Sequence, residues 1–211
     1  TGFAVRGVDT ASDGTIVALA GGDGERIQSD VVVAGIGMQP NIELAQAAGL
    51  EVDVGIVVDG LSQTSDPDIV AAGACTVPHS ALYGRRLRLE SVPNALEQAR
   101  AAASALVGKP KPNRSVPWFW SDQYDLKLQM VGLSQGCDRC VLRGDPDSRH
   151  FIAFYLREGV VIAADAVSRP ADFLVAKRLV AAGVSAGPAL LADESRALKD
   201  LLAATGSAAS A

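Results

Sequence analysis

Short apolar runs separated by turn residues open the chain. Runs at residues 3–5 and 15–19 flank Ser12-Asp13-Gly14, and a glycine-rich turn follows at residues 21–24. An Asp-Gly pair between β-rich runs is typical of a hairpin. The continuous apolar run at residues 30–35 ends in glycine and predicts a strand buried on both faces, as in a parallel sheet.

Helix and strand patterns alternate after that run. Residues 40–50 predict a short helix closed by Gly49, and residues 55–59 and 69–73 predict two more strands. The clearest helix covers residues 91–107. Ser91 is a suitable N-cap, Pro93 lies in the first turn and Gly108 follows the end.

The pattern of apolar positions changes beyond the Pro- and Lys-rich linker at residues 109–113. An antiparallel meander is predicted, with a tight turn at residues 157–159 and strands at residues 126–133, 140–143, 151–156 and 160–167. Amphipathic helices are predicted at residues 171–182 and 193–204, before a small, polar tail at 205–211. The fold class is therefore α/β followed, from about Pro117, by α+β.

Composition excludes several classes of function. Of 211 residues, 48% are hydrophobic and the net charge is −5, which supports a globular core and argues against nucleic acid or an anionic membrane as partner. No apolar run reaches the roughly 18 residues of a membrane span. Three cysteines are too few for a disulfide framework, which fits a cytoplasmic location.

The octet at residues 117–124 concentrates scarce aromatic residues. It holds both tryptophans, Trp118 and Trp120, in a chain that is 5% aromatic. Such a cluster suits a face that stacks on a flat ligand or a partner. A plain core strand explains the octet equally simply.

Four segments in this order resemble the flavin-dependent ferredoxin reductases of bacterial oxygenase systems, the group of putidaredoxin and rhodocoxin reductases. They are residues 33–41, 64–75, 88–99 and 117–124. The resemblance implies a glutathione-reductase-like Rossmann-type FAD domain, an inserted nicotinamide domain and a C-terminal α+β domain. Residues 1–33 would be the tail of the nicotinamide domain, 34–112 the returning part of the FAD domain and 113–211 the C-terminal domain. The glycine-rich phosphate loops of the family lie upstream of the matched region.

The resemblance also implies site residues. Gly73, the position of Ala74, the helix start at Ser91 and Val92, and Trp120 would bind FAD. Gly35, Gly37 and Glu90 would lie near the nicotinamide of NAD(P)H, and Trp118, Arg100 and Lys177 would meet a [2Fe–2S] ferredoxin.

Each of these positions has a plainer explanation. Every helix has unpaired N–H groups at its start, as at Ser91, and a glycine turn follows many strands. Glu90 would pair equally well with Arg86 or Arg88. Arg100 and Lys177 would be ordinary solvated residues on helix faces. No residue is expected to act as a catalytic acid or base, because the cofactors carry the chemistry.

Ala74 departs from the family pattern. The resemblance implies an aspartate there, which accepts a hydrogen bond from an FAD ribityl hydroxyl, whereas alanine has no acceptor. Losing a hydrogen bond to a charged group costs about 1.5–3 kcal/mol, so FAD binding is expected to be weakened.

Cys137 and Cys140 form a C-x-x-C motif. A redox pair would need a helix N-terminus, and a zinc site would need further ligands, which Cys75, His79 and His150 do not supply in a recognised spacing. The spacing alone is best explained as coincidence. No metal site is predicted.

The leading hypothesis is therefore the C-terminal part of an NAD(P)H-dependent, FAD-containing ferredoxin reductase, with the 211 residues inactive alone. One alternative is another flavin-linked electron-transfer subunit, of the rubredoxin or nitrite reductase type. A second alternative is a non-enzymatic module that docks ferredoxin.

Overall fold

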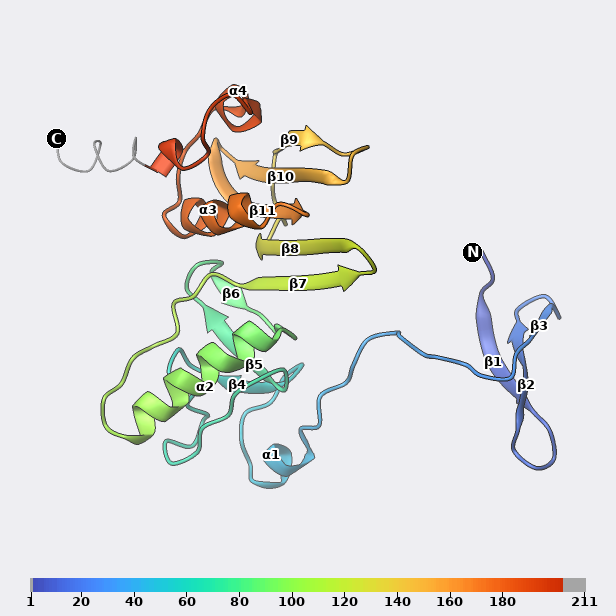
Figure 1. The fold of residues 1–211 in the computed structure, drawn as a ribbon. Helices are drawn as coiled ribbons and strands as arrows, with labels where there is room; N and C mark the ends of the chain where they lie inside the picture. Colours follow the sequence, from blue (N-terminus) through green and yellow to red (C-terminus); the bar gives the residue numbers. More distant parts are fainter. Residues whose placement is uncertain (1, 203–211) are drawn as a thin grey trace. The chain divides into compact units, whose positions relative to one another are not determined.

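The computed structural model describes residues 2–202 (Figure 1). The chain separates into two compact units, Thr1–Gln39 and Pro40–Ala211, which are described in turn. The tail predicted at residues 205–211 lies outside the described residues.

The first unit contains the predicted hairpin. Strands β1 (Val5–Thr10), β2 (Ile16–Gly21) and β3 (Arg26–Gln28) form an antiparallel sheet in the order β1-β2-β3. The Asp13 carboxylate accepts a hydrogen bond from the Thr15 N–H at 3.0 Å, and Gly14 takes a positive φ of 86°. These local contacts are why the Asp-Gly signal predicts the turn correctly.

The strand predicted at residues 30–35 is wrong. This described segment runs as irregular chain, and Val31 and Val33 are 76% and 90% exposed. A strand buried on both faces needs neighbouring strands to satisfy its backbone groups, and none in the described unit pairs with it.

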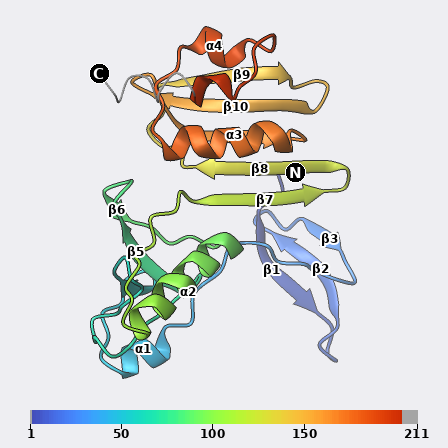
Figure 2. The same ribbon diagram turned by 60° about the vertical axis from the view of Figure 1, so that its left-hand side comes forward.

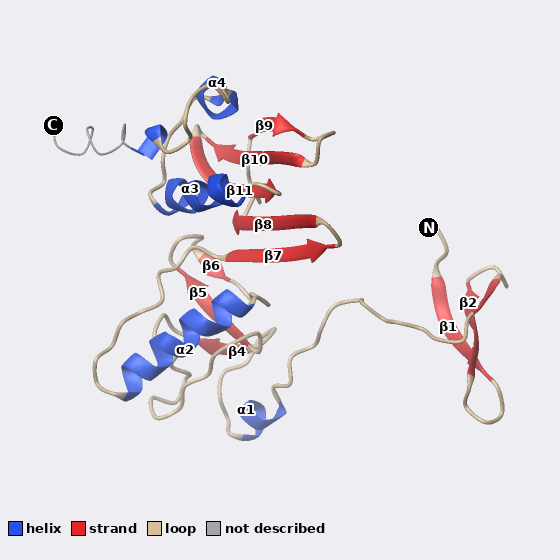
Figure 3. Cartoon of the chain, viewed as in Figure 1, coloured by secondary structure: helices blue, strands red, loops and turns tan. Residues whose placement is uncertain are grey.

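The second unit begins with helix α1 (Glu43–Ala47) and a small mixed sheet. In that sheet β4 (Ile56–Val58) pairs in parallel with β5 (Thr76–Ser80), which pairs antiparallel with β6 (Arg85–Arg86). The strands cross the lower left part of Figure 3. The strand predicted at residues 69–73 is wrong, because the chain turns at Gly73 with φ 100° and the strand begins three residues later.

Helix α2 (Val92–Leu106) confirms the clearest sequence prediction. Ser91 Oγ accepts a hydrogen bond from the Asn94 N–H at 3.3 Å, and Pro93 lies in the first turn. Gly108 follows the helix with φ 69°. Local signals at both ends set its length.

The C-terminal part is built on a five-stranded antiparallel sheet. Its strands are β7 (Trp118–Gln123), β8 (Leu126–Gly132), β9 (Arg139–Asp145), β10 (His150–Arg157) and β11 (Val160–Val167). The turn predicted at residues 157–159 joins β10 to β11, with positive φ at Glu158 and Gly159.

The order of the strands corrects the predicted meander. It is β7-β8-β11-β10-β9, so β8 pairs with β11 and not with β9 (Figure 1). Tight turns pair β7 with β8, β9 with β10 and β10 with β11. The β8–β9 connection is longer and leaves β9 at an edge.

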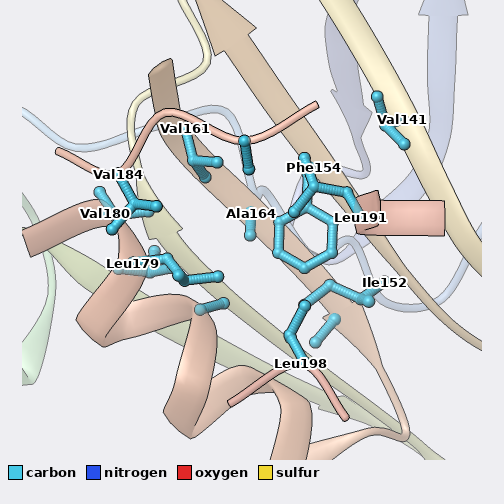
Figure 4. Close-up of a cluster of buried hydrophobic side chains, with 14 of the residues drawn as sticks. Val141, Ile152, Phe154, Val161, Ala164, Leu179, Val180, Val184, Leu191 and Leu198 are labelled. Carbon is cyan, nitrogen blue, oxygen red and sulfur yellow. The ribbon is translucent and has the colours of Figure 1, made fainter. Parts of the chain in front are cut away.

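Helix α3 (Pro170–Ala181) covers one face of this sheet and confirms the helix predicted at residues 171–182 (Figure 2). Phe154 lies at the centre of the core beneath it, with Ile152, Leu191 and Leu198 around the ring (Figure 4). Burying such side chains contributes about 1.5–3 kcal/mol each, so the core fixes both α3 and the segment that follows it.

The helix predicted at residues 193–204 is largely wrong. A short helix, α4 (Pro188–Ala192), ends at Asp193, whose carboxylate accepts hydrogen bonds from the Ser195 N–H and hydroxyl. That Asx turn competes with helical hydrogen bonding. Helix resumes at residues 200–202, and residues 203–204 are not described.

Candidate functional site

A cavity of about 730 Å³ lies within the second unit, between the start of α2 and the C-terminal sheet. This volume is typical of sites for small molecules and cofactors. Its wall combines basic, apolar and aromatic side chains. They are Arg85, Arg86, Leu87, Arg88, Leu89, Glu90, Ser91, Pro117, Trp118, Phe119, Met130, Gly132, Leu133, Ser134, Gln135, Ala163 and Asp165.

The helix start contributes polar backbone to this cavity. Ser91 lines it. In the first turn of α2, Pro93 has no N–H and the Asn94 N–H donates to Ser91 Oγ, so only the Val92 N–H lacks a partner within the helix start. Val92, the first helical residue, is 60% exposed and is not among the lining residues. The positive end of a 15-residue helix favours a ligand that carries negative charge.

Glu90 lines the same cavity and is paired with Arg88, whose Nη1 lies 2.6 Å from its carboxylate. Arg86 pairs instead with Glu51 at 2.8 Å. The ion pair offered as the plainer explanation of Glu90 is thus formed with Arg88, while Glu90 keeps its place beside Ser91.

Gly73 packs against the first turns of α2. A Cβ built on it would lie 3.9 Å from the Ala95 methyl, and its N–H donates to Gln98 Oε1 at 2.6 Å. The same oxygen accepts from the Thr76 hydroxyl at 2.9 Å. Gln98 therefore holds the 73–76 turn, and with it Ala74, close to the start of α2.

The aromatic octet is a strand, β7, with its side chains on both faces of the sheet. Trp118 and Trp120 are two residues apart and share a face, with ring centroids 5.5 Å apart. Phe119 stands opposite Met130 in the register of β7 and β8, and both line the cavity. Trp118 also lines it, whereas Trp120 does not and is 39% exposed.

The basic residues assigned to ferredoxin docking are both partnered. Lys177 Nζ lies 4.2 Å from the centroid of the Trp118 ring, and Phe173 completes the cluster, its ring 5.9 Å from that of Trp118. Arg100 forms an ion pair with Glu97 on the exposed side of α2. The structure thus joins Lys177 to Trp118 and places Arg100 on a different helix.

Gly35 and Gly37 belong to the first unit, so they are described apart from Glu90. Both are exposed, and Gly37 adopts a φ of 99° that favours glycine. Their role near a nicotinamide stays a prediction.

Asp165 is a cavity residue that sequence reasoning missed. It lies on β11 between Ala164 and Ala166 and accepts a hydrogen bond from the Tyr155 hydroxyl at 2.8 Å. Burial raises the pKa of the Asp165 carboxyl, although the hydrogen bond from Tyr155 opposes this change. A charged residue inside the otherwise apolar run 160–167 is the signal that could have found it.

The described part of the chain offers neither a cluster of metal ligands nor a membrane-spanning helix. Residues 2–202 contain no cluster of three or more His, Cys, Asp or Glu side chains arranged to hold a metal ion. Within the same residues, no helix has both the length and the apolar character needed to cross a bilayer.

Comparisons with known proteins match almost the whole chain. The pyridine nucleotide-disulphide oxidoreductase family matches residues 1–99, and the reductase C-terminal family matches residues 118–202. The fold is thus part of a pyridine nucleotide-disulphide oxidoreductase domain followed by a reductase C-terminal domain with its five-stranded sheet.

Two curated relatives show the extent of the likeness. The chain is 49% identical over 205 residues to putidaredoxin reductase of Pseudomonas putida, covering 97% of this chain and 49% of that protein. It is 42% identical over 189 residues to rhodocoxin reductase of Rhodococcus erythropolis, covering 90% and 44%. The chain therefore spans about half the length of these relatives.

Solved structures agree with these matches. The chain matches a covalent putidaredoxin reductase–putidaredoxin complex with a TM-score of 0.90 and 48% identity, covering 98% of this chain and 50% of that one. It matches the ferredoxin reductase of the CYP199A2 system from Rhodopseudomonas palustris with a TM-score of 0.88 and 40% identity, covering 94% and 49%. Together with the two matching domain families, these likenesses show that the chain belongs to the ferredoxin reductase family of putidaredoxin and rhodocoxin reductases.

Proposed function

We propose that this chain is the C-terminal part of an FAD-dependent NAD(P)H:ferredoxin reductase that serves an oxygenase system. The observation that carries the proposal is its 49% identity to putidaredoxin reductase, maintained over 205 residues that include the helix start at Ser91 and the aromatic strand β7. The domain limits proposed are residues 1–33, 34–112 and 113–211 for the nicotinamide, FAD and C-terminal parts.

The cavity beneath the start of α2 suits one wall of a flavin site. It joins apolar and aromatic side chains, which suit a flat ring, to a helix N-terminus, which favours negative charge on that ring. FAD would supply hydride acceptance and single-electron transfer. Ser91 at the helix start would orient the ring, and Phe119 with Met130 would exclude water.

Ala74 fits the cofactor less well. Its methyl group offers no acceptor, although Gly73 and Gln98 hold the 73–76 turn near α2. We therefore propose that FAD is held more weakly here than in relatives with an aspartate at this position, and that the 211 residues bind no flavin without further chain.

The partner proposed is a [2Fe–2S] ferredoxin. A relative of this chain, a putidaredoxin reductase, has been solved in a covalent complex with putidaredoxin. We place docking on the β7 and α3 side of the C-terminal domain, where Trp118 and Trp120 are stacked and Lys177 adds positive charge. Arg100 would extend the basic surface from α2.

The test compares this chain alone with a longer reductase that contains it. The longer protein should be yellow and should reduce ferredoxin with NADH or NADPH, and the 211 residues alone should be colourless and inactive. Flavin absorbance and dye reduction by the 211 residues alone would contradict the proposed inactivity. A longer protein that binds FAD but reduces no ferredoxin would contradict the proposed reaction.

A docking module without flavin is the second candidate, and Ala74 is the observation that favours it. Calorimetric titration of the 211 residues with ferredoxin separates the two roles. Binding that Trp118→Leu weakens and Tyr124→Asn leaves unchanged would support docking at β7, since Tyr124 lies fully exposed at the hairpin tip. Equal effects of both variants would rule out a defined site there.

A further inference from the structure

Two exposed cysteines flank an irregularity at the start of β9. Cys137 and Cys140 are both free thiols and both exposed, and residues 134–140 form an exposed stretch of chain. The proposed electron-transfer reaction uses neither of them. They are the strongest group of nucleophiles outside the cavity.

The backbone between them carries a two-against-one pairing. The Asp138 N–H donates to the Leu156 carbonyl at 2.9 Å, while Arg139 is the residue that stands opposite Leu156 in the strand register. Two residues set against one are the mark of a β-bulge, which shifts the alternation of side chains by one position. Cys140 therefore lies on β9 just after the bulge, and Cys137 lies in the irregular chain just before it.

The register of β9 and β10 shows on which face of the sheet Cys140 lies. Cys140 stands opposite Tyr155, whose hydroxyl donates to Asp165 on the face away from α3. Cys137 influences the ionisation of both Cys140 and Tyr155, as expected of a thiol near both. The two sulfurs thus belong to one group of side chains.

The bulge is also held in place from outside. The Asp138 carboxylate accepts a hydrogen bond from the Glu158 N–H at 2.6 Å, and the Cys137 N–H donates to the Ser134 carbonyl at 3.1 Å. A thiol pair held on a fixed turn loses less chain entropy on closing a ring than a pair on a free segment.

We propose that Cys137 and Cys140 form a reversible redox site, which low-molecular-weight disulfides such as oxidised glutathione convert to an intrachain disulfide. The proposal does not depend on flavin binding or on ferredoxin docking.

The disulfide between Cys137 and Cys140 forms in two thiol–disulfide exchange steps, in which atoms and electrons balance. The Cys137 thiolate attacks one sulfur of the small disulfide, whose S–S bond breaks and releases one thiolate. Cys140 then loses its proton and attacks the Cys137 sulfur, which releases the second thiolate. Two protein thiols are oxidised, and the small disulfide gains the two electrons and, from solvent, the two protons.

The environments of the two thiols set this order. Burial of the Cys140 sulfur raises the pKa of that thiol, and Cys137 and Asp165 raise it further. Cys140 is therefore the poorer first nucleophile and acts as the resolving thiol.

The protein offers a direct readout, because Arg139 lies between the two cysteines. After incubation with oxidised glutathione, blocking of free thiols and denaturation, trypsin should cut behind Lys127, Arg139 and Arg143. An intrachain disulfide would leave peptides 128–139 and 140–143 linked, and dithiothreitol would separate them. The number of reactive thiols should fall from three to one.

Serine variants give the matched controls. Cys75→Ser should form the link as the parent chain does, while Cys137→Ser and Cys140→Ser should stop at a single glutathione adduct. Separate adducts on both peptides of the parent chain would overturn the proposal. So would a link that involves Cys75, a link between two chains, or unmodified thiols.

Discussion

The Lys177 ammonium lies 4.2 Å from the centroid of the Trp118 ring, which also packs beside Phe173. The lysine and the phenylalanine are four residues apart on α3, so one helical turn places both an aromatic ring and a cation against the tryptophan. This contact joins β7 to α3 and fixes the side chain that lines the cavity.

Replacing Lys177 by methionine should therefore destabilise the second unit. The variant keeps most of the apolar stem and removes the charge, so the expected loss is about 0.5–1 kcal/mol, that of a partly exposed cation–π contact. Urea unfolding followed by tryptophan fluorescence would measure it. Lys177→Arg should keep the stability, and equal losses in both variants would contradict a cation–π contact.

The Gln98 side chain gives a second prediction. Its oxygen accepts from the Gly73 N–H and from the Thr76 hydroxyl, and the residue is 1% exposed. Gln98→Leu would leave the Gly73 N–H without this acceptor, whereas the Thr76 hydroxyl would still reach the Gly73 carbonyl at 2.9 Å, so the expected loss is about 1–3 kcal/mol.

Thr76→Val is the matched control for that change, because it leaves the Gly73 N–H bonded to Gln98. Its loss should be clearly smaller in the same urea titration. If Thr76→Val costs as much as Gln98→Leu, then Gln98 does not hold the 73–76 turn in the way described.

Arg143 makes the third prediction. Its guanidinium is 4% exposed and donates to the carbonyls of Leu191, Asp193 and Arg196, at 3.2, 2.7 and 2.6 Å. Arg143→Met should free the segment at residues 191–198, which would then exchange its amide hydrogens faster. Strands β1 to β3 should exchange at their original rate.

Arg143→Lys tests the geometry of that cluster. A single ammonium cannot reproduce a planar fork that reaches three carbonyls, so lysine should restore little of the protection. Full restoration by lysine would show that charge alone, rather than the fork, holds the segment.

Local signals explain where the sequence predicted the fold correctly. Ser91, Pro93 and Gly108 define α2 from within its own ends, and Asp13-Gly14 defines the first hairpin in the same way. The failures involve partners distant along the chain. The exposed run at residues 30–35 has no neighbouring strand in the described unit, and β11 reaches β8 across some thirty residues.

The residues of the candidate site show the same contrast between local signals and distant contacts. Glu90, Ser91 and Trp118 came from segments that the resemblance brought to attention, and the structure places all three on one cavity. Asp165 and Gln98 escaped notice because their importance lies in contacts across elements, with Tyr155 and with Gly73. No local pattern encodes such contacts.

Ala74 leads to the fourth prediction, which concerns the longer reductase. The family resemblance implies an aspartate there that accepts a hydrogen bond from FAD, so Ala74→Asp should tighten FAD binding about 10- to 100-fold, the equivalent of about 1.5–3 kcal/mol. Flavin fluorescence during dilution would give the dissociation constants. Ala74→Asn, which has a neutral acceptor, should gain less, and unchanged affinity in both variants would argue that position 74 lies away from the ribityl chain.

The half-buried carboxyl of Asp165 leads to the last prediction, on how stability depends on pH. Its pKa is raised by burial in the folded state, so the folded chain binds this proton more tightly than the unfolded chain. The contribution of this carboxyl to the free energy of unfolding is complete below the ordinary carboxyl pKa and is lost as pH rises through the raised value.

Asp165→Asn cannot ionise and still offers Tyr155 an acceptor, so it should be the more stable protein at neutral pH. The difference in urea midpoint between the variant and the parent chain should shrink as pH falls toward the ordinary carboxyl range. A difference that stays constant with pH would mean that Asp165 does not titrate with a raised pKa, because its hydrogen bond from Tyr155 cancels the effect of burial.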